Sequence, residues 1–165
     1  MAGCKPEYLP VVVAAVEASC TAKIQHPRGD RHDLRRTPVI VVNGSIRHQR
    51  GMNMAINVFG RGNRPNATTG RAVKLLVRNV GGGRPGEVER ACFGSGSKCT
   101  CCFAEFEEKS RWEPLHVKRG FDSDDSVVTC FGLEGGPHQI RDATDEEIRV
   151  KADKIVEPVV AALVC

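Results

Sequence analysis

The sequence predicts an α/β protein, a mixed single domain over residues 1–165 with a small sheet flanked by about three helices. Its 165 residues suit one domain that buries a substantial core. Segments with a helical apolar pattern alternate with short runs of β-branched residues, which is typical of mixed α/β folds. Aromatic residues make up only 5% of the chain. The core must therefore be built mainly from aliphatic side chains.

The first predicted helix runs from Pro6 to about Ala18. Proline suits the first helical turn, and Glu7 complements the positive end of the helix dipole. Apolar residues cover nearly the whole circumference, which indicates a helix that is buried or packed on two sides. This helix begins a few residues after Met1. We therefore expect the chain to be a truncated form of a longer protein, or to need a partner.

A polar, basic loop over Thr21–Arg36 precedes the first predicted strand, Pro38–Asn43. The strand is a continuous β-branched run ended by Gly44. A second helix is predicted from about Thr68 to Asn79, and either Thr68 or Asn66 can cap its first turn.

Two more strands and a last helix are expected in the second half of the chain. Residues Cys99–Phe106 and Val127–Leu133 have strand-like patterns, and a tight loop over Gly135–His138 follows. The last helix opens at Thr144, where Glu147 completes a capping box.

Charge and cysteine content narrow the functional classes. The net charge of +4 is modest, and the clustered arginines lack the interleaved aromatics of nucleic-acid binders. We therefore expect no nucleic acid as partner, and favour a small anionic molecule. The N-terminus has no signal-peptide pattern, and the longest apolar run, Val11–Val16, is too short to span a membrane. We therefore expect a reducing, cytoplasmic location, in which the thiols are free, and no membrane partner.

The segment Cys99–His116 combines three cysteines, four glutamates, the only tryptophan and a histidine. Three interpretations of its thiols remain open. They are a thioredoxin-like pair, ligands of a divalent metal such as zinc or iron, and small apolar residues of the core. The candidate metal ligands are Cys99, Cys101, Cys102 and Cys130.

The same segment carries groups suited to acid–base chemistry. Glu113 and His116 have the Glu-x-x-His spacing that binds metals on helices, although Pro114 prevents a regular helix unless the helix starts there. Glu107 and Glu108 follow the predicted strand, at the end where functional groups gather. The alternative is a solvated acidic turn.

The segment from Gly60 to Arg71 leads into the N-terminus of the second helix. Backbone N–H groups there, together with Arg61, Arg64 and Arg71, would suit a phosphate or carboxylate. The segment matches neither the dinucleotide fingerprint nor the Walker loop. A glycine-rich loop that only turns the chain is the alternative.

Three stretches resemble a poorly characterised microbial family, in places associated with thiol/selenol-motif (UGSC-type) proteins. They are VVNGSIRHQRGMN, NRPNATTGRAVKLLVRNVGG and CFAEFEEKSRWEPLHVKRGF, followed by GGPH. Phe106 and Arg111 depart from the family pattern, which has asparagine and proline there, and Cys99 and Cys101 are additions. The resemblance implies no settled activity. The positions that match its motifs are Asn43, Asn66, Arg71, Glu105, Glu107, Glu108, Trp112, Glu113, His116 and His138.

Taken together, these features predict an enzyme of the lyase or hydrolase type that acts on a small anionic molecule. The expected catalytic residues are Glu107, Glu113, His116 and His138. The expected substrate-binding residues are Asn43, Asn66, Arg71 and Trp112. Two alternatives remain: a non-catalytic accessory subunit, whose first helix docks on a partner or a second copy, and a thiol-based metal-handling protein.

Overall fold

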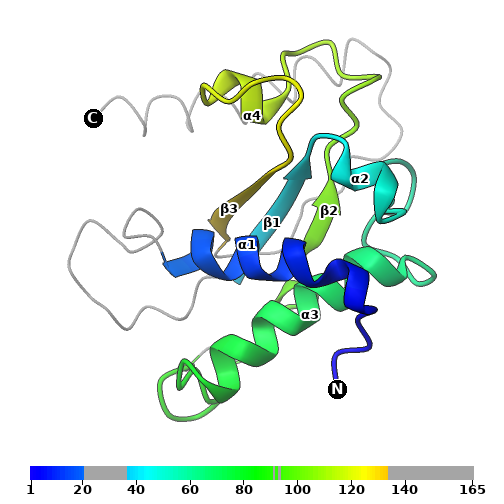
Figure 1. Ribbon diagram of the computed structural model, residues 1–165. Coiled ribbons are helices and arrows are strands. Elements are labelled where there is room, and N and C mark those ends of the chain that lie inside the picture. Colours follow the sequence, from blue (N-terminus) through cyan, green and yellow to red (C-terminus); the bar gives the residue numbers. More distant parts are fainter. Residues whose placement is uncertain (21–36, 91, 93, 134–165) are drawn as a thin grey trace, which may run out of the picture.

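The computed structural model describes residues 1–20, 37–90, 92 and 94–133, and these form a mixed α/β fold (Figure 1). A small three-stranded sheet is surrounded by helices, as the sequence predicts. The elements in chain order are the 3-10 helix η1 (Pro6–Tyr8), α1 (Leu9–Cys20), β1 (Thr37–Asn43), α2 (Ile46–Gln49), α3 (Arg64–Asn79), the 3-10 helix η3 (Gly96–Lys98), β2 (Cys102–Ala104), α4 (Leu115–Lys118) and β3 (Val127–Leu133).

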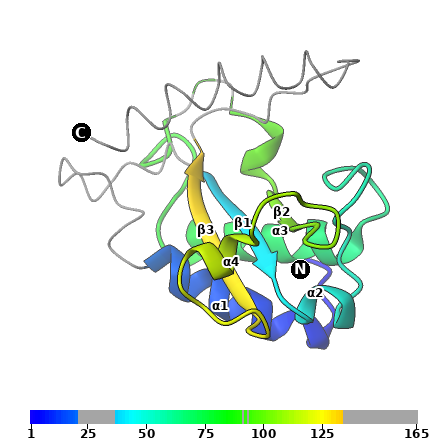
Figure 2. The same ribbon diagram turned by 90° about the horizontal axis from the view of Figure 1, so that it is seen from above.

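The sheet has the strand order β2-β1-β3, with β1 in the centre. The strands β1 and β2 are parallel, and Val42 pairs with Ala104. On the other side β3 runs antiparallel to β1 along its full length, from Thr37 opposite Leu133 to Asn43 opposite Val127. Because β1 and β2 are parallel, their carboxyl ends meet at one edge of the sheet. Figure 1 shows α2 and α4 at this edge, and Figure 2 views the molecule from above.

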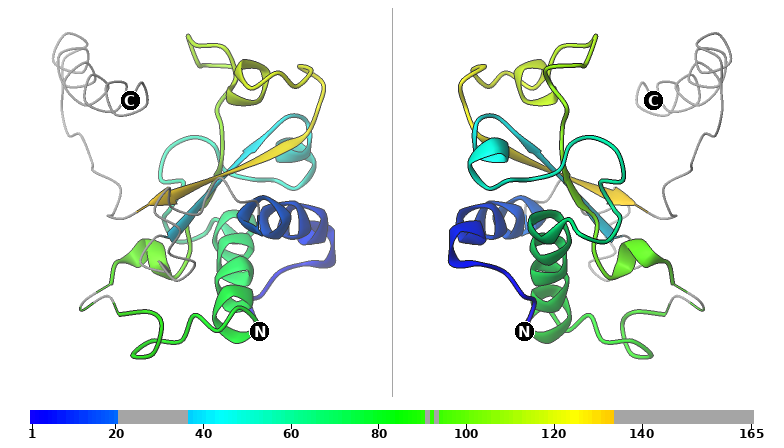
Figure 3. Two further views of the ribbon diagram at one scale, coloured as in Figure 1. Left: turned by 90° about the vertical axis from the view of Figure 1, so that its left-hand side faces the viewer. Right: turned by 90° about the vertical axis from the view of Figure 1, so that its right-hand side faces the viewer.

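The core lies between one face of the sheet and the helices α1 and α3. These helices contact each other, and they lie on the opposite side of the molecule from α4 (Figure 3). The glycine at position 70 allows α3 to approach β2 closely, because a Cβ there would collide with Thr100 Oγ1. The core cluster consists of Val11, Val12, Ala15, Ile40, Val42, Met52, Val73, Cys102 and Ala104.

The alternation of side chains in the strands places a second set of residues on the other face. Ile40 and Val42 of β1 belong to the core cluster, so Val41 and Asn43 point away from α1 and α3. In the same way Cys102 and Ala104 face the core, and Glu105 continues the other face. The Glu105 N–H donates to the Val42 carbonyl at 3.1 Å, which extends the pairing beyond β2. Asn43 and Glu105 are therefore neighbours at the carboxyl ends of two parallel strands.

Most predicted elements are confirmed, and three differ from the prediction. The helix α3 begins at Arg64 rather than near Thr68, so Asn66 lies inside it and caps nothing. The strand β2 is confined to Cys102–Ala104, shorter than the predicted Cys99–Phe106, and the 3-10 helix η3 precedes it at residues 96–98. The helix α1 is buried on one side only, with Val11, Val12 and Ala15 inside. Leu9 and Val13 keep 61% and 46% of their surface exposed.

Several predictions lie outside the described residues. They concern the loop over 21–36, the tight loop with His138 and the helix expected from Thr144. Within the described residues, no helix has the length and apolar character needed to cross a membrane.

Candidate functional site

Polar side chains gather at the edge of the sheet where β1 and β2 end. We call this group the strand-end site. Its members come from the end of β1, from α2, from the turn after β2 and from α4. They are Asn43, Arg47, Glu105, Glu107, Glu108 and His116.

Asn43 links the two strand ends. Its side chain is completely buried, and its Nδ2 donates to Glu105 Oε2 at 2.6 Å and to Glu107 Oε1 at 2.9 Å. These two bonds fix the orientation of the amide, because an amide oxygen in place of Nδ2 would face two carboxylates. Asn43 Oδ1 is thus directed elsewhere, and it has no hydrogen-bond partner among the described residues.

Gly44 turns the chain from β1 into α2 and contributes its backbone to the site. Its φ of +81° lies in the left-handed region that favours glycine. A Cβ at this position would collide with the carbonyl oxygen of Asp125. The Gly44 N–H donates to Glu107 Oε1 at 2.9 Å, so the turn positions the Glu107 carboxylate.

Arg47 occupies the centre of the site. It is buried, and its five N–H groups are directed at five oxygens. The two carbonyl oxygens are those of Gly44 at 2.8 Å and Glu105 at 2.9 Å. The carboxylate oxygens are Glu107 Oε2 at 2.7 Å, Glu108 Oε1 at 3.0 Å and Glu108 Oε2 at 3.1 Å. In the sequence, Arg47 is one of many arginines, and the sequence analysis did not predict it as a site residue.

Glu108 forms the exposed rim of the site. Hydrogen bonds from Arg47, from its own backbone N–H and from His48 hold the pKa of the Glu108 carboxyl at about 2. The His48 Nε2 lies 2.8 Å from Glu108 Oε1. Glu107 lies deeper, with 13% of its side chain exposed against 47% for Glu108.

His116 faces Glu107 from α4. The helix begins directly after Pro114, which is the one arrangement in which the sequence allowed a helix here. The imidazole is completely buried, and its Nε2 lies 3.3 Å from the Ser123 carbonyl oxygen. A carbonyl only accepts, so Nε2 carries a proton, and in the neutral ring Nδ1 has a free lone pair. Nδ1 has no hydrogen-bond partner among the described residues and lies 4.0 Å from Glu107 Oε1.

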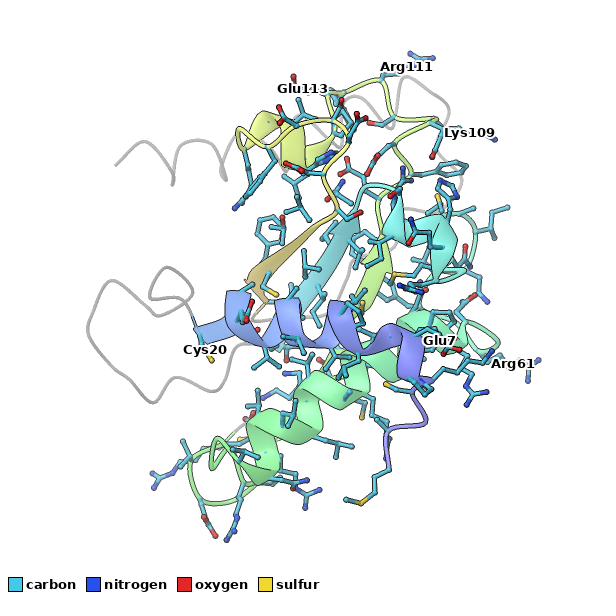
Figure 4. All side chains as sticks on the ribbon, viewed as in Figure 1. Glu7, Cys20, Arg61, Lys109, Arg111 and Glu113 are labelled. Atoms are coloured by element: carbon cyan, nitrogen blue, oxygen red, sulfur yellow. The ribbon has the colours of Figure 1, made fainter. Side chains whose placement is uncertain are left out.

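Other predicted site residues lie apart from this cluster. Glu113 is exposed at the outer surface beside α4 (Figure 4). Trp112 is 82% exposed, and Arg71 is exposed on α3. His138 lies outside the described residues.

Asn66, a predicted substrate contact, holds a loop in this structure. Its Oδ1 accepts from the Asn53 N–H at 3.0 Å, and its Nδ2 donates to the carbonyls of Asn53 at 2.8 Å and Val58 at 3.3 Å. All its hydrogen-bonding groups therefore hold the loop before α3. The predicted anion site nearby is not assembled, because Arg64 Nε donates to the Gly3 carbonyl and Arg61 points outward (Figure 4).

The candidate metal-binding cysteines are dispersed over the fold. Cys102 is in the core cluster, Cys130 packs against that cluster, and Cys99 is exposed. Burial raises the pKa of the thiols of Cys101, Cys102 and Cys130, which disfavours the thiolate that a metal needs. Among residues 1–20, 37–90, 92 and 94–133, no group of three or more His, Cys, Asp or Glu is placed to hold a metal ion. The zinc or iron site stays a prediction.

The chain matches no protein-family model, no curated protein and no solved structure. The resemblance in its motifs therefore stays a prediction, and the chemistry of the strand-end site is the basis for assigning a function.

Proposed function

We propose that the protein is a small-molecule enzyme of the lyase or hydrolase type, in which His116 exchanges a proton with the substrate beside Glu107. The supporting observation is the imidazole itself. It is fully buried, its Nδ1 lone pair has no described partner, and Nδ1 lies 4.0 Å from a carboxylate oxygen. Buried polar atoms are nearly always hydrogen-bonded in native proteins, so such an atom requires an explanation.

The geometry gives each group a role. Ser123 fixes the tautomer through Nε2, which leaves Nδ1 as the proton acceptor. A proton taken up at Nδ1 would be attracted by the Glu107 carboxylate. That carboxylate is held in place by Asn43, the Gly44 N–H and Arg47. Preorganised groups of this kind need little rearrangement during a reaction.

The location of the site agrees with this role. In α/β folds ligands bind beyond the carboxyl ends of parallel strands, and Asn43 and Glu105 lie at such ends. The segment that links β2 to α4 supplies Glu107 and Glu108 and leads to His116. Functional residues are often carried by loops that a rigid sheet positions.

The test is a screen for turnover with a variant set chosen from the structure. Wild-type protein is assayed on carboxylic and phosphate esters, and on amino and hydroxy acids for elimination. Any turnover should fall by about 10²- to 10⁴-fold in His116→Gln and Glu107→Gln, the range typical of general acid–base groups. The exposed Glu87→Gln is the matched control and should retain wild-type turnover. Unchanged turnover in His116→Gln, or a wild-type chain inert on every class, contradicts the proposal.

One observation favours a second function, that of an accessory subunit. Leu9 and Val13 lie one helical turn apart on α1 and remain 61% and 46% exposed. Exposed apolar side chains on one helix face are typical of protein contacts. The measurement is solution mass by light scattering. A stable monomer that Leu9→Lys does not alter counts against this function.

A further inference from the structure

Two buried acceptor atoms of the strand-end site have no hydrogen-bond partner among the described residues, whereas the N–H groups of Asn43, Arg47 and His116 all have one. Asn43 Oδ1 and His116 Nδ1 are both in fully buried side chains, and both lack a described partner. The amide orientation and the imidazole tautomer are fixed by the bonds described above, so both atoms are acceptors. Whatever group satisfies them must donate hydrogen bonds.

The charges of the site point the same way. Glu105, Glu107 and Glu108 bring three carboxylates, and Arg47 brings one guanidinium, which leaves two negative charges when both imidazoles are neutral. Every N–H of Arg47 is already directed at an oxygen of the protein. The guanidinium therefore has no free N–H to donate to an anionic group, although the sequence favoured an anionic ligand.

The distance between His116 and Glu107 allows one donor atom to lie between them. His116 Nδ1 and Glu107 Oε1 are 4.0 Å apart, too far for a direct hydrogen bond. A nitrogen placed about 2.8 Å from each would form an ordinary triangle with them. Asn43 lies against the same carboxylate oxygen, at 2.9 Å through Nδ2. A third acceptor is near, because among the described residues only Oε2 of Glu105 receives hydrogen bonds, from Asn43 and from the Leu115 N–H at 3.0 Å.

We propose that Asn43, Glu105 and His116 recognise the primary ammonium group of a small cationic ligand at the strand-end site. An ammonium carries three N–H donors and one positive charge, which matches the unpartnered acceptors and offsets the excess of carboxylates. This assignment names the substrate class of the proposed enzyme and so rests on the proposed function. The proton step balances: one N–H bond of the ammonium breaks, Nδ1–H forms, and the ligand is left as a neutral amine beside an imidazolium.

The experiment measures binding, so that it does not depend on turnover. Ethylammonium, ethanol and acetate are titrated into wild-type protein at constant ionic strength, and the backbone amide signals of residues 43, 105 and 116 are followed by NMR. Ethylammonium should shift these signals with a dissociation constant at least ten times lower than that of ethanol or acetate. Glu105→Gln should weaken ethylammonium binding at least tenfold, and the exposed Glu87→Gln should leave it unchanged.

The outcomes separate the two proposals. Stronger binding of acetate, equal binding of ethanol, or no ethylammonium response at 100 mM overturns the ammonium site and leaves acid–base catalysis to be judged by turnover. Selective ethylammonium binding that survives His116→Gln also overturns the assignment of His116 as a contact. A selective ammonium site in a protein whose turnover is unaffected by His116→Gln would contradict the proposed catalysis alone. Because Glu105→Gln could disturb the fold, His116→Gln is the second variant, and it should also weaken ethylammonium binding at least tenfold.

Discussion

His116 Nδ1 and Glu107 Oε1 face each other across 4.0 Å, and no donor from the described residues lies between them. The separation is too long for a hydrogen bond, so the two groups can share a proton only through a third group. A side chain with an unused lone pair at zero exposure differs from an ordinary core histidine, which has both nitrogens bonded. The arrangement is the centre of the chemistry proposed above.

The first prediction concerns the tautomer of His116. Because Nε2 donates to the Ser123 carbonyl, the neutral ring should carry its proton on Nε2. Long-range ¹H–¹⁵N correlation spectra of the imidazole should therefore show a pyrrole-type Nε2 and a pyridine-type Nδ1, with the signals assigned by their loss in His116→Gln. A protonated Nδ1 in the neutral ring would remove the proposed base.

The second prediction concerns Arg47. Replacing it with Met keeps much of the side-chain volume but leaves Glu107 Oε2 and the Glu105 carbonyl without the N–H groups that donate to them. Removing one partner of a buried ion pair costs about 3–5 kcal/mol in the free energy of unfolding. Urea denaturation measures the loss. The control is Arg71→Met on the exposed surface of α3, which should stay within about 0.5 kcal/mol of wild type. Equal stability of both variants would show that the Arg47 network is weak.

The third prediction concerns Gly44. Alanine there needs a left-handed φ of +81° and places its Cβ against the Asp125 carbonyl oxygen. Strain and displacement together should lower the free energy of unfolding by about 2–4 kcal/mol. The same shift would move the N–H that holds Glu107. Gly51→Ala is the matched control, because its φ of +62° is also positive but nothing lies within 4 Å of its Cβ. A loss in Gly51→Ala as large as that in Gly44→Ala would refute the steric account.

The sequence predicted the sheet better than the site. The continuous β-branched run placed β1 correctly, because such a run has few alternative structures when it must be buried, and the strand-like pattern of Val127–Leu133 placed β3. The predicted start of α3 was wrong. Asn66 is a residue type that often caps helices, but its side-chain amide forms hydrogen bonds with the loop before the helix. Local pattern cannot reveal that choice, which depends on residues 53 and 58.

For the site, the sequence identified those members whose chemistry is unusual at a strand end. Asn43, Glu107 and His116 were expected to be functional, and the fold brings them together. Arg47 was hidden among many arginines, and only the pairing of β1 with β2 shows why it is buried. The sequence does contain one signal that could have suggested Arg47. It is an arginine three residues after a strand-ending Asn-Gly, in a chain that has an acidic cluster elsewhere. Arg71 and Trp112 were selected by their motifs, yet both side chains face solvent.

The fourth prediction tests the structural role of Asn66. Alanine at this position removes three hydrogen bonds to backbone groups of Asn53 and Val58 in a buried environment. The free energy of unfolding should fall by about 2–3 kcal/mol. Ethylammonium affinity and any turnover should remain within twofold of wild type, provided that the variant is measured well below its unfolding midpoint. A selective loss of binding with intact stability would restore the substrate contact that the motif suggested. The exposed Asn79→Ala, at the end of α3, is the control.

The fifth prediction concerns Lys74, a half-buried residue of α3. Burial and the nearby Lys98 lower the pKa of its ammonium to about 8, despite an opposing contribution from Glu89. Between pH 8 and 10.5 the unfolded chain therefore binds more protons at this residue than the folded one, so its contribution to stability rises with pH in that window. Below pH 8 the charged form is a constant cost, of about 1 kcal/mol after allowance for its partial exposure.

Lys74→Met should remove the cost, so it should be more stable than wild type at pH 7, and the difference should disappear by pH 10.5. Urea denaturation of both proteins at the two pH values measures this. The exposed Lys118→Met is the control and should show no such difference at either pH. A stability difference between Lys74→Met and wild type that does not change with pH would mean that packing, and not the charge of Lys74, determines the effect.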